Sequence, residues 1–197
     1  MSIFSPDTLF LSSERTFLRC PKFDDYTAWK SLYLRSLDFL KPYEPERPRD
    51  YVTNFSHFSS MVEIAEMEIW QDKGYRFFIF DKETSELLGG IALSNLVRGS
   101  FQNAHCGYWI GEKFGRQGFM TEALRETIRF SFRHLKLHRV QASCLVKNDR
   151  SIGLLEKLNF RNEGIAKGYL KIDGKWQDHI RYAMTFEDYL NNKEIFE

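Results

Sequence analysis

A glycine-rich turn that joins a strand directly to a long helix is the feature that most constrains how this chain folds. Along residues 106–111, Cys106, Tyr108 and Ile110 alternate with two glycines and a tryptophan, which predicts a strand. The turn EKFGRQGFM follows, and a long helix is expected from about residue 118 to residue 135. Residues 138–146 alternate again and predict the next strand. This order predicts a sheet with a helix packed on it.

The rest of the chain supplies further elements of both kinds. Periodicity predicts helices in residues 29–37, 58–69 and 148–158, a β-hairpin in residues 75–97, and strands in residues 160–172 and 175–186. Asp173-Gly174 is a strong hairpin signal between the last two strands, and the prolines of residues 41–50 predict a surface loop. We therefore expect an α/β (α+β) fold in one domain, residues 1–197. Its central sheet is expected to be mixed, mostly antiparallel and of about seven strands, with helices on both faces.

The charge balance and the cysteines argue against several classes of partner. The chain has 28 Lys+Arg and 27 Asp+Glu, a formal net charge of +1, so direct binding to nucleic acid is not expected. Its longest uncharged apolar run, residues 87–97, is too short to cross a bilayer. Cys20, Cys106 and Cys144 form no CxxC pair, which indicates neither a zinc site nor a disulfide framework. We expect a soluble, cytoplasmic protein without a metal.

The turn GRQGFM, residues 115–120, is a candidate anion site. Backbone N–H groups at a helix start are unpaired and lie at the positive end of the helix dipole, so they bind phosphate groups. Arg116 can add a charged contact. A two-glycine turn before a helix is also common as plain structure. No GKS or GKT follows and no GxGxxG is present, so neither a P-loop nor a dinucleotide site is indicated.

In its context this turn resembles the acetyl-coenzyme A loop of the GCN5-related N-acetyltransferases. That family's pattern is Gln/Arg-x-x-Gly-x-Gly/Ala; Gly118 matches the central glycine, while Gly115 and Met120 depart from the first and last positions. Other segments resemble the family's ribosomal-protein N-terminal acetyltransferases: FLKPYEP, SNLVRGSF, GYWIG, NDRSIGLLEKLNF and GIAKGYLKIDGKWQDH. Together these segments span most of the chain.

The resemblance implies acetyl-coenzyme A as cofactor. It also implies that the strand at residues 106–111 separates from the strand at residues 140–146, so that the pantetheine arm inserts between them. The expected cofactor-binding residues are Trp109, Ile110, Gly115, Arg116, Gln117, Gly118, Phe119, Met120, Asn148 and Ser151. A backbone N–H near Trp109 and Ile110 would polarise the acetyl carbonyl, and Ser151 would act as a general acid on the leaving sulfur. The plain alternatives are a helix cap for Asn148 and a first-turn helix position for Ser151.

Acetyl transfer needs a neutral amine. An α-amine, with a pKa near 7.7 to 8.0, is roughly one tenth neutral at pH 7, whereas a lysine with a pKa near 10.4 is almost fully protonated. A modest base therefore suffices for an N-terminus. His105 stands where many family members carry a glutamate and is the first candidate base, although a lone histidine is often structural. Glu112 and Glu44 are further candidates.

In the family, the acceptor binds between the first two helices and the last hairpin. By resemblance, the expected substrate-binding residues are Phe39, Lys41, Tyr43, Glu44, Arg98, Phe101 and Tyr169. A glutamate in this groove would pair with a protonated amine. The plain alternative is that the aromatic residues belong to the core and the charged residues are solvated.

The function implied by the resemblance is acetylation of the N-terminal alanine of a ribosomal protein, the fifth protein of the small subunit. The amine would attack the thioester directly in a ternary complex. The partner would be this N-terminus, alone or within a ribosome assembly intermediate, and the enzyme a monomer or a dimer. Two alternatives stay open: acetylation of a small amine such as a polyamine or an antibiotic, and a non-catalytic role as a coenzyme A-binding, ribosome-associated protein.

Overall fold

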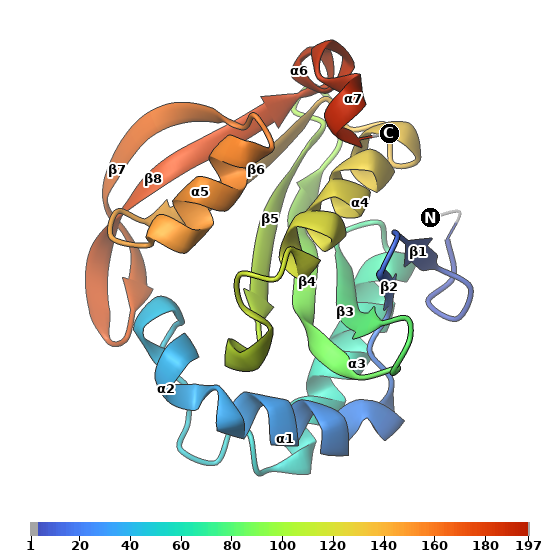
Figure 1. Cartoon of the computed structure of the whole chain (residues 1–197), viewed down its shortest axis with the longest axis vertical. Helices are drawn as coiled ribbons and strands as arrows, with labels where there is room; N and C mark the ends of the chain where they lie inside the picture. Colours follow the sequence, from blue (N-terminus) through green and yellow to red (C-terminus); the bar gives the residue numbers. More distant parts are fainter. Residues whose placement is uncertain (1–3, 197) are drawn as a thin grey trace.

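Strands from both halves of the chain form one mixed sheet (Figure 1). The computed structural model describes residues 4–196. Its strands are β1 (Phe10–Ser12), β2 (Thr16–Arg19), β3 (Tyr75–Asp81), β4 (Leu87–Val97), β5 (Asn103–Ile110), β6 (Arg139–Leu145), β7 (Arg161–Ile172) and β8 (Lys175–Thr185). They lie in the order β1-β2-β3-β4-β5-β6-β8-β7, and of these neighbouring pairs only β5–β6 is parallel. The predicted mixed, mostly antiparallel sheet is confirmed.

The sheet has one strand more than the sequence predicts. The segment before the first helix forms two short strands, β1 and β2, of 3 and 4 residues. Strands this short show no recognisable alternation of polar and apolar residues. Of the single domain predicted for residues 1–197, residues 1–3 and 197 lie outside the described part of the chain.

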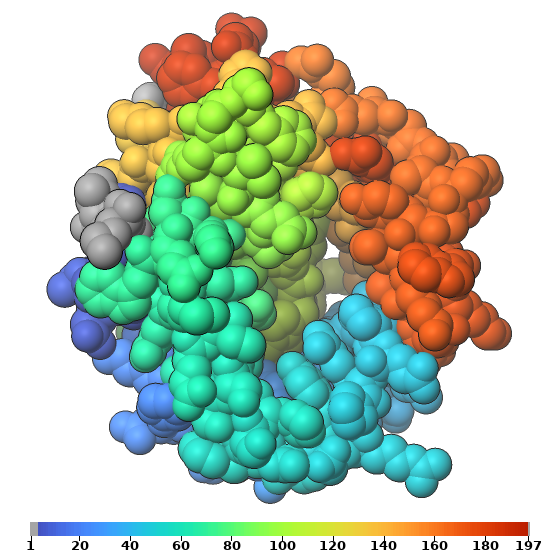
Figure 2. All heavy atoms as spheres, turned by 180° about the vertical axis from the view of Figure 1, so that it is seen from behind, coloured from blue at the N-terminus to red at the C-terminus, as the bar shows by residue number. Residues whose placement is uncertain are grey.

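Helices cover both faces of this sheet. They are α1 (Tyr26–Arg35), α2 (Leu37–Leu40), α3 (Phe55–Trp70), α4 (Phe119–Arg133), α5 (Asp149–Lys157), α6 (Phe186–Asn191) and α7 (Lys193–Phe196), with 3-10 turns η1 (Phe23–Asp25), η2 (Lys41–Tyr43) and η3 (Glu112–Phe114). α4 and α5 lie on one face and α3 on the other, while α1 and α2 cross one end of the sheet (Figure 1, Figure 2). Among residues 4–196, no helix is long and apolar enough to cross a bilayer.

Apolar stripes on the two long helices explain this layering. α3 buries Phe58, Val62, Ala65 and Ile69, and α4 buries Ala123, Leu124 and Ile128, all at helical spacing and at most 1% exposed. Each stripe must pack against another apolar surface. The central strand β3 provides one on each of its faces, because Phe77, Phe78 and Ile79 are all buried. The sheet is therefore the middle layer of three.

The parallel pair β5–β6 opens soon after it begins. β5 pairs with β6 only through Asn103–His105. Beyond that point β5 stays paired with β4 as far as Ile110, and β6 stays paired with β8 as far as Leu145. A gap therefore lies between the second halves of the two strands. This separation agrees with the expectation drawn from the resemblance.

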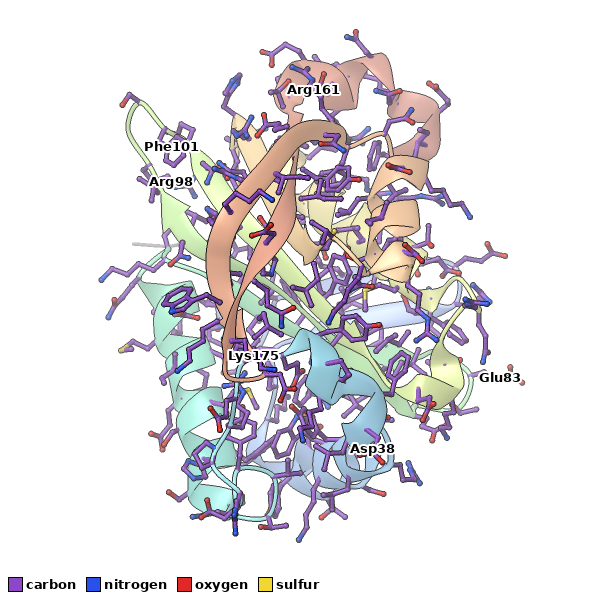
Figure 3. The ribbon with its side chains drawn as sticks, turned by 90° about the vertical axis from the view of Figure 1, so that its left-hand side faces the viewer. Asp38, Glu83, Arg98, Phe101, Arg161 and Lys175 are labelled. Atoms are coloured by element: carbon purple, nitrogen blue, oxygen red, sulfur yellow. The ribbon has the colours of Figure 1, made fainter. Side chains whose placement is uncertain are left out.

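The β7–β8 hairpin lies beside this gap, and its tip at Lys175 reaches the helical segment around α2 (Figure 3). The Asp173 N–H donates to the Glu44 carbonyl at 3.0 Å. From α2, the Phe39 ring contacts the guanidinium of Arg150 in α5, with the guanidinium carbon 4.6 Å from the ring centroid. These two contacts connect the segment after α1 to the second half of the chain across the gap.

Candidate active site

The edge of β5 that faces the gap carries unpaired backbone groups. The Gly111 N–H donates to the Leu88 carbonyl at 2.8 Å, and backbone groups along an antiparallel strand alternate in direction. The N–H and C=O groups of Tyr108 and Ile110 therefore point away from β4 and into the gap. Pairing with β6 has ended at His105, so this edge is free to bind an extended ligand that carries amides.

A cavity of about 490 Å³ adjoins this edge on the side of α4 and α5. Its walls come from α2 and the loop after it, β5, η3, the start of α4 and the first turns of α5. The lining residues are Phe39, Leu40, Tyr43, Glu44, Tyr108, Trp109, Ile110, Phe114, Gly115, Arg116, Gly118, Met120, Thr121, Asn148, Asp149, Arg150, Ser151, Gly153, Leu154 and Lys157. The basic residues Arg116, Arg150 and Lys157 stand among them, which favours an anionic ligand.

The glycine-rich turn shapes one end of this first cavity. Arg116 and Gly118 both have positive φ, +61° and +87°, and α4 begins at Phe119. The first intrahelical hydrogen bond runs from the Glu122 N–H to the Gly118 carbonyl at 3.1 Å. The N–H groups of the first helical turn before Glu122 are therefore available to an anion. The turn at residues 115–120 therefore has the free N–H groups that the predicted anion site requires.

Arg15, between β1 and β2, holds this turn from outside the cavity. Its guanidinium donates to the Gln117 carbonyl at 3.0 Å and to the Glu122 carboxylate at 2.6 Å, and it lies over the Phe119 ring. Burial alone would raise the pKa of Glu122, but hydrogen bonds from Arg15 and Ser13 outweigh it and hold that pKa below its ordinary value. Glu122 is thus ionised at neutral pH, and its ion pair with Arg15 holds the Arg15 guanidinium against the turn.

Two hydroxyl groups meet inside the first cavity. The Tyr108 hydroxyl and the Ser151 Oγ lie 2.7 Å apart. Asn148 is the N-cap of α5, and its Oδ1 accepts the Ser151 N–H at 3.2 Å. Burial raises the pKa of Tyr108 above its usual range, so its hydroxyl keeps its proton at neutral pH. The capping role of Asn148 therefore coexists with a place in the cavity wall.

A second cavity, of about 330 Å³, opens on the side of α1 and α3. Its lining residues are Trp29, Tyr33, Glu44, Pro45, Arg47, Tyr51, Met61, Arg76, Phe77, Phe78, Gly90, Ile91, Ala92, Ser94, Gly107, Tyr108 and Trp109. Glu44, Tyr108 and Trp109 also line the first cavity. Figure 2, which looks onto this side, shows a hollow between the green atoms of β4 and β5 and the orange atoms of β7 and β8; this hollow is the gap beside β5, because no residue of β7 or β8 lines the second cavity. The two cavities therefore meet at three shared residues.

Trp109 forms the wall between the two cavities. A Cβ atom at Gly90 would lie 2.6 Å from the indole Nε1 of Trp109, so the absence of a side chain at position 90 lets the indole rest on β4. The Tyr33 ring packs edge-on against the indole, with centroids 5.7 Å apart. The Tyr33 hydroxyl donates to the Glu44 carboxylate. The pKa of Tyr33 is raised mainly by burial, and this hydrogen bond raises it further. Glu44 is thus fixed at the boundary of the two cavities.

Many of the residues expected from the sequence line the first cavity. These are Phe39, Tyr43, Glu44, Trp109, Ile110, Gly115, Arg116, Gly118, Met120, Asn148 and Ser151. Gln117 and Phe119 belong to the turn, but their side chains point elsewhere: the Gln117 amide donates to the Lys113 carbonyl at 2.6 Å, and Phe119 is buried under Arg15.

The other expected residues line neither cavity. Arg98 forms an ion pair with Asp72 at 2.7 Å. Arg98 and Phe101 both lie beyond the end of β4 that is far from the hairpin tip at Lys175 (Figure 3). Lys41, Glu112 and Phe101 are exposed, and Tyr169 packs on His179. His105 is half-buried on β5, on the strand face that Gly107 and Trp109 share.

Sequence reasoning missed Tyr108, Arg15 and the second cavity's arginines, Arg47 and Arg76. Tyr108 could have been found from strand alternation, because it lies next to Trp109 and shares a strand face with Cys106 and Ile110. Arg15 gives no local signal, since its partner Glu122 is 107 residues away along the chain.

Comparison with known proteins identifies the family. The protein-family model described as "Acetyltransferase (GNAT) domain" matches residues 15–161 of this chain. A ribosomal protein uS5-alanine N-acetyltransferase of Escherichia coli (strain K12) is 38% identical over 167 residues, 84% of this chain and 86% of that protein. Mycobacterium smegmatis RimJ, solved in complex with CoA-disulfide, has a TM-score of 0.87 at 27% identity, covering 94% of this chain and 91% of its own. A ribosomal-protein-S5-alanine acetyltransferase from Vibrio fischeri has a TM-score of 0.84 at 27% identity, covering 92% and 98%. These matches, together with the open β5 edge and the turn before α4, mean that the chain belongs to the GNAT family of acetyltransferases.

Proposed function

We propose that this chain transfers the acetyl group of acetyl-CoA to the N-terminal alanine α-amine of ribosomal protein uS5. The observation that carries the proposal is the meeting of two cavities at Glu44, Tyr108 and Trp109, beside the unpaired β5 edge. The relative in Escherichia coli is named for this acceptor, and the Mycobacterium smegmatis relative was solved with a CoA disulfide. A ribosomal-protein acceptor also supports a cytoplasmic setting, with the free N-terminus or an assembly intermediate as the partner.

The first cavity offers donors that fit coenzyme A. The free N–H groups at the start of α4, with Arg116, suit a pyrophosphate. The backbone groups of Tyr108 and Ile110 that point into the gap suit the amides of a pantetheine arm. When bound, acetyl-CoA supplies a thioester carbonyl that an amine can attack.

The residues of the chain would assist this transfer in two ways. The N–H groups of Tyr108 and Ile110 both point into the gap. One of them would donate to the thioester carbonyl oxygen and stabilise the negative charge that develops on it, while the remaining backbone groups would bind the pantetheine amides. The paired hydroxyls of Tyr108 and Ser151, 2.7 Å apart, hold a proton that they would donate to the leaving sulfur. Both actions take place within the first cavity.

The second cavity suits the acceptor. The Glu44 carboxylate, at the boundary, would bind the protonated α-amine. His105 lies on the strand face of Gly107 and Trp109, which line this cavity, but its own side chain lines neither cavity, so it would act on the amine through intervening water. Burial and the charges of Arg181 and Arg139 lower the pKa of His105, so the imidazole is neutral at pH 7 and able to take the amine's proton. A polyamine would need more acid than this cavity offers, because Arg47 and Arg76 also line it.

The first test is release of free CoA thiol from acetyl-CoA in the presence of a short peptide that begins with Ala. We expect release with the free peptide and none with a copy blocked at its N-terminus. Spermidine serves as the small-amine comparison, and mass spectrometry of the products locates the acetyl group. Acetylation of spermidine alone, or CoA binding without release for any amine, would contradict the proposed acceptor.

Replacing His105 by Gln should lower kcat/KM for this peptide about tenfold at pH 7 and much less at pH 9. At pH 9 most of the α-amine is already neutral, so a base adds little. The pH profile of kcat/KM for both enzymes measures the effect. Glu112→Gln tests the second candidate, whose side chain is exposed in η3, after the end of β5, whereas His105 is half-buried on the strand; we expect its profile to match the wild type. An equal loss at both pH values in His105→Gln would indicate a structural histidine.

A further inference from the structure

The second cavity contains two arginines that lack a carboxylate partner among residues 4–196. Arg76 comes from β3, and its Nε is shielded from solvent without a hydrogen-bond partner in the described structure. Arg47, in the loop after η2, only covers the Tyr51 ring, with its guanidinium carbon 4.6 Å from the ring centroid. A shielded guanidinium N–H without an acceptor is costly. Arg76 as a whole is half-buried and lines the cavity, so an acceptor there would bind the accessible part of its guanidinium rather than the shielded Nε.

The nearby acids do not neutralise Arg76. Glu44 accepts the Tyr33 hydroxyl, at the boundary with the first cavity. Glu66 of α3 is close enough to raise the pKa of Cys20, which burial already raises to about 12, and Arg76 acts on the same thiol in the opposite direction. Within the described part of the chain, however, no ion pair joins Arg76 to either acid. Its charge is therefore available.

The floor of the cavity leaves room for a ligand to reach Arg76. In the sheet register Arg76 lies opposite Ala92, and Ala92 lies opposite Gly107. A Cβ at Gly107 would have nothing within 4 Å. Two strand spacings, about 10 Å, separate Arg76 from β5. An extended peptide advances roughly 3.3 to 3.6 Å per residue, so a chain whose amine lies at Trp109 brings one of residues two to four near Arg76.

We infer that the second cavity contains an anion subsite, in which Arg76 binds a carboxylate side chain carried by one of residues two to four of the acceptor peptide. The guanidinium N–H groups pair with a carboxylate more strongly than with a neutral amide. Arg47, at the rim, adds positive charge on the path of the peptide. The inference rests on the proposed function, because it assumes that the acceptor is a peptide N-terminus.

The test compares peptides that begin with Ala and carry a single Glu at position two, three or four with copies that carry Gln there. At one of these positions we expect kcat/KM to be about tenfold higher for Glu than for Gln. Arg76→Gln should reduce this ratio to about one while changing kcat/KM for the Gln peptide less than threefold. Arg76→Lys, which keeps the charge, should retain part of the preference. Arg161→Gln, on the exposed outer end of β7 (Figure 3), is the matched control and should leave the ratio unchanged.

The outcomes separate this inference from the function on which it rests. Equal kcat/KM for the Glu and Gln peptides at all three positions would overturn the subsite and leave N-terminal acetylation standing. A loss in Arg76→Gln that is equal for both peptides, with the ratio retained, would show that Arg76 only supports the fold and would also overturn it. Failure to acetylate any of the peptides would overturn the proposed function and the subsite together.

Discussion

Replacing Tyr108 by Phe is expected to lower kcat for acetyl transfer about 100-fold and to leave the affinity for CoA within about threefold. The Tyr108 hydroxyl lies 2.7 Å from Ser151 Oγ inside the first cavity, and burial keeps it protonated by raising its pKa. Loss of a positioned general acid costs about 10²-fold or more. Stopped-flow measurement of a single turnover, with CoA binding measured separately by calorimetry, distinguishes the two effects.

Two further variants sharpen this result. Ser151→Ala should lower kcat to a similar degree, and the double variant should be little worse than either single one, because the two hydroxyls act as a unit. Tyr26→Phe removes another tyrosine hydroxyl, one that donates to the Thr53 carbonyl at 2.7 Å and lines neither cavity. It should keep the wild-type kcat. Full additivity of the Tyr108 and Ser151 effects, or an unchanged kcat in Tyr108→Phe, would contradict the shared proton.

Replacing Gly89 by Ala is expected to lower the free energy of unfolding by about 1 to 3 kcal/mol and to reduce acetyl transfer about 100-fold. A Cβ at this position would lie 2.3 Å from the Trp109 carbonyl oxygen and 2.8 Å from the Ile110 Cα. Both contacts are with backbone, which cannot turn aside as a side chain can. β5 would have to move away from β4 at the residues that face the gap, and a misplacement of about 1 Å can cost 10²-fold in rate.

Gly107→Ala is the matched control for stability. It adds the same methyl group to the neighbouring strand, where a Cβ has nothing within 4 Å. Its unfolding free energy should stay within about 0.5 kcal/mol of the wild type. Urea denaturation followed by tryptophan fluorescence measures both variants. Equal midpoints for Gly89→Ala and the wild type would mean that the two strands tolerate the displacement.

The parts of the fold that the sequence predicts are those with a local signal. The strand, turn and helix around Gly118 and the hairpin at Asp173-Gly174 follow from glycines and periodicity within a few residues. Two short strands at β1 and β2 are not predicted, because their 3 and 4 residues carry no periodicity. β2 is stabilised by pairing with β3, which lies more than 50 residues further along the chain, and β1 by pairing with β2.

In the candidate site, too, the features with a local sequence signal are predicted and those that depend on distant residues are not. The glycine-rich turn before α4 is a local feature, and the turn lies where the sequence predicts it. Arg98 was expected in the acceptor groove, but its guanidinium is taken by Asp72, 26 residues away, and by the Leu135 carbonyl. Arg76 gave no sign of a role, because its exposure to the second cavity depends on Ala92 and Gly107 in two other strands. Contacts of this kind arise only from tertiary packing.

The placement of the two cavities has a consequence for the order of events during turnover. The two cavities lie on opposite faces of the sheet, one beside α4 and α5 and the other beside α1 and α3, and they share Glu44, Tyr108 and Trp109 among the described residues. With the donor in the first cavity and the acceptor in the second, as proposed, a bound donor would leave the second cavity open. We then expect no fixed order of substrate binding or product release.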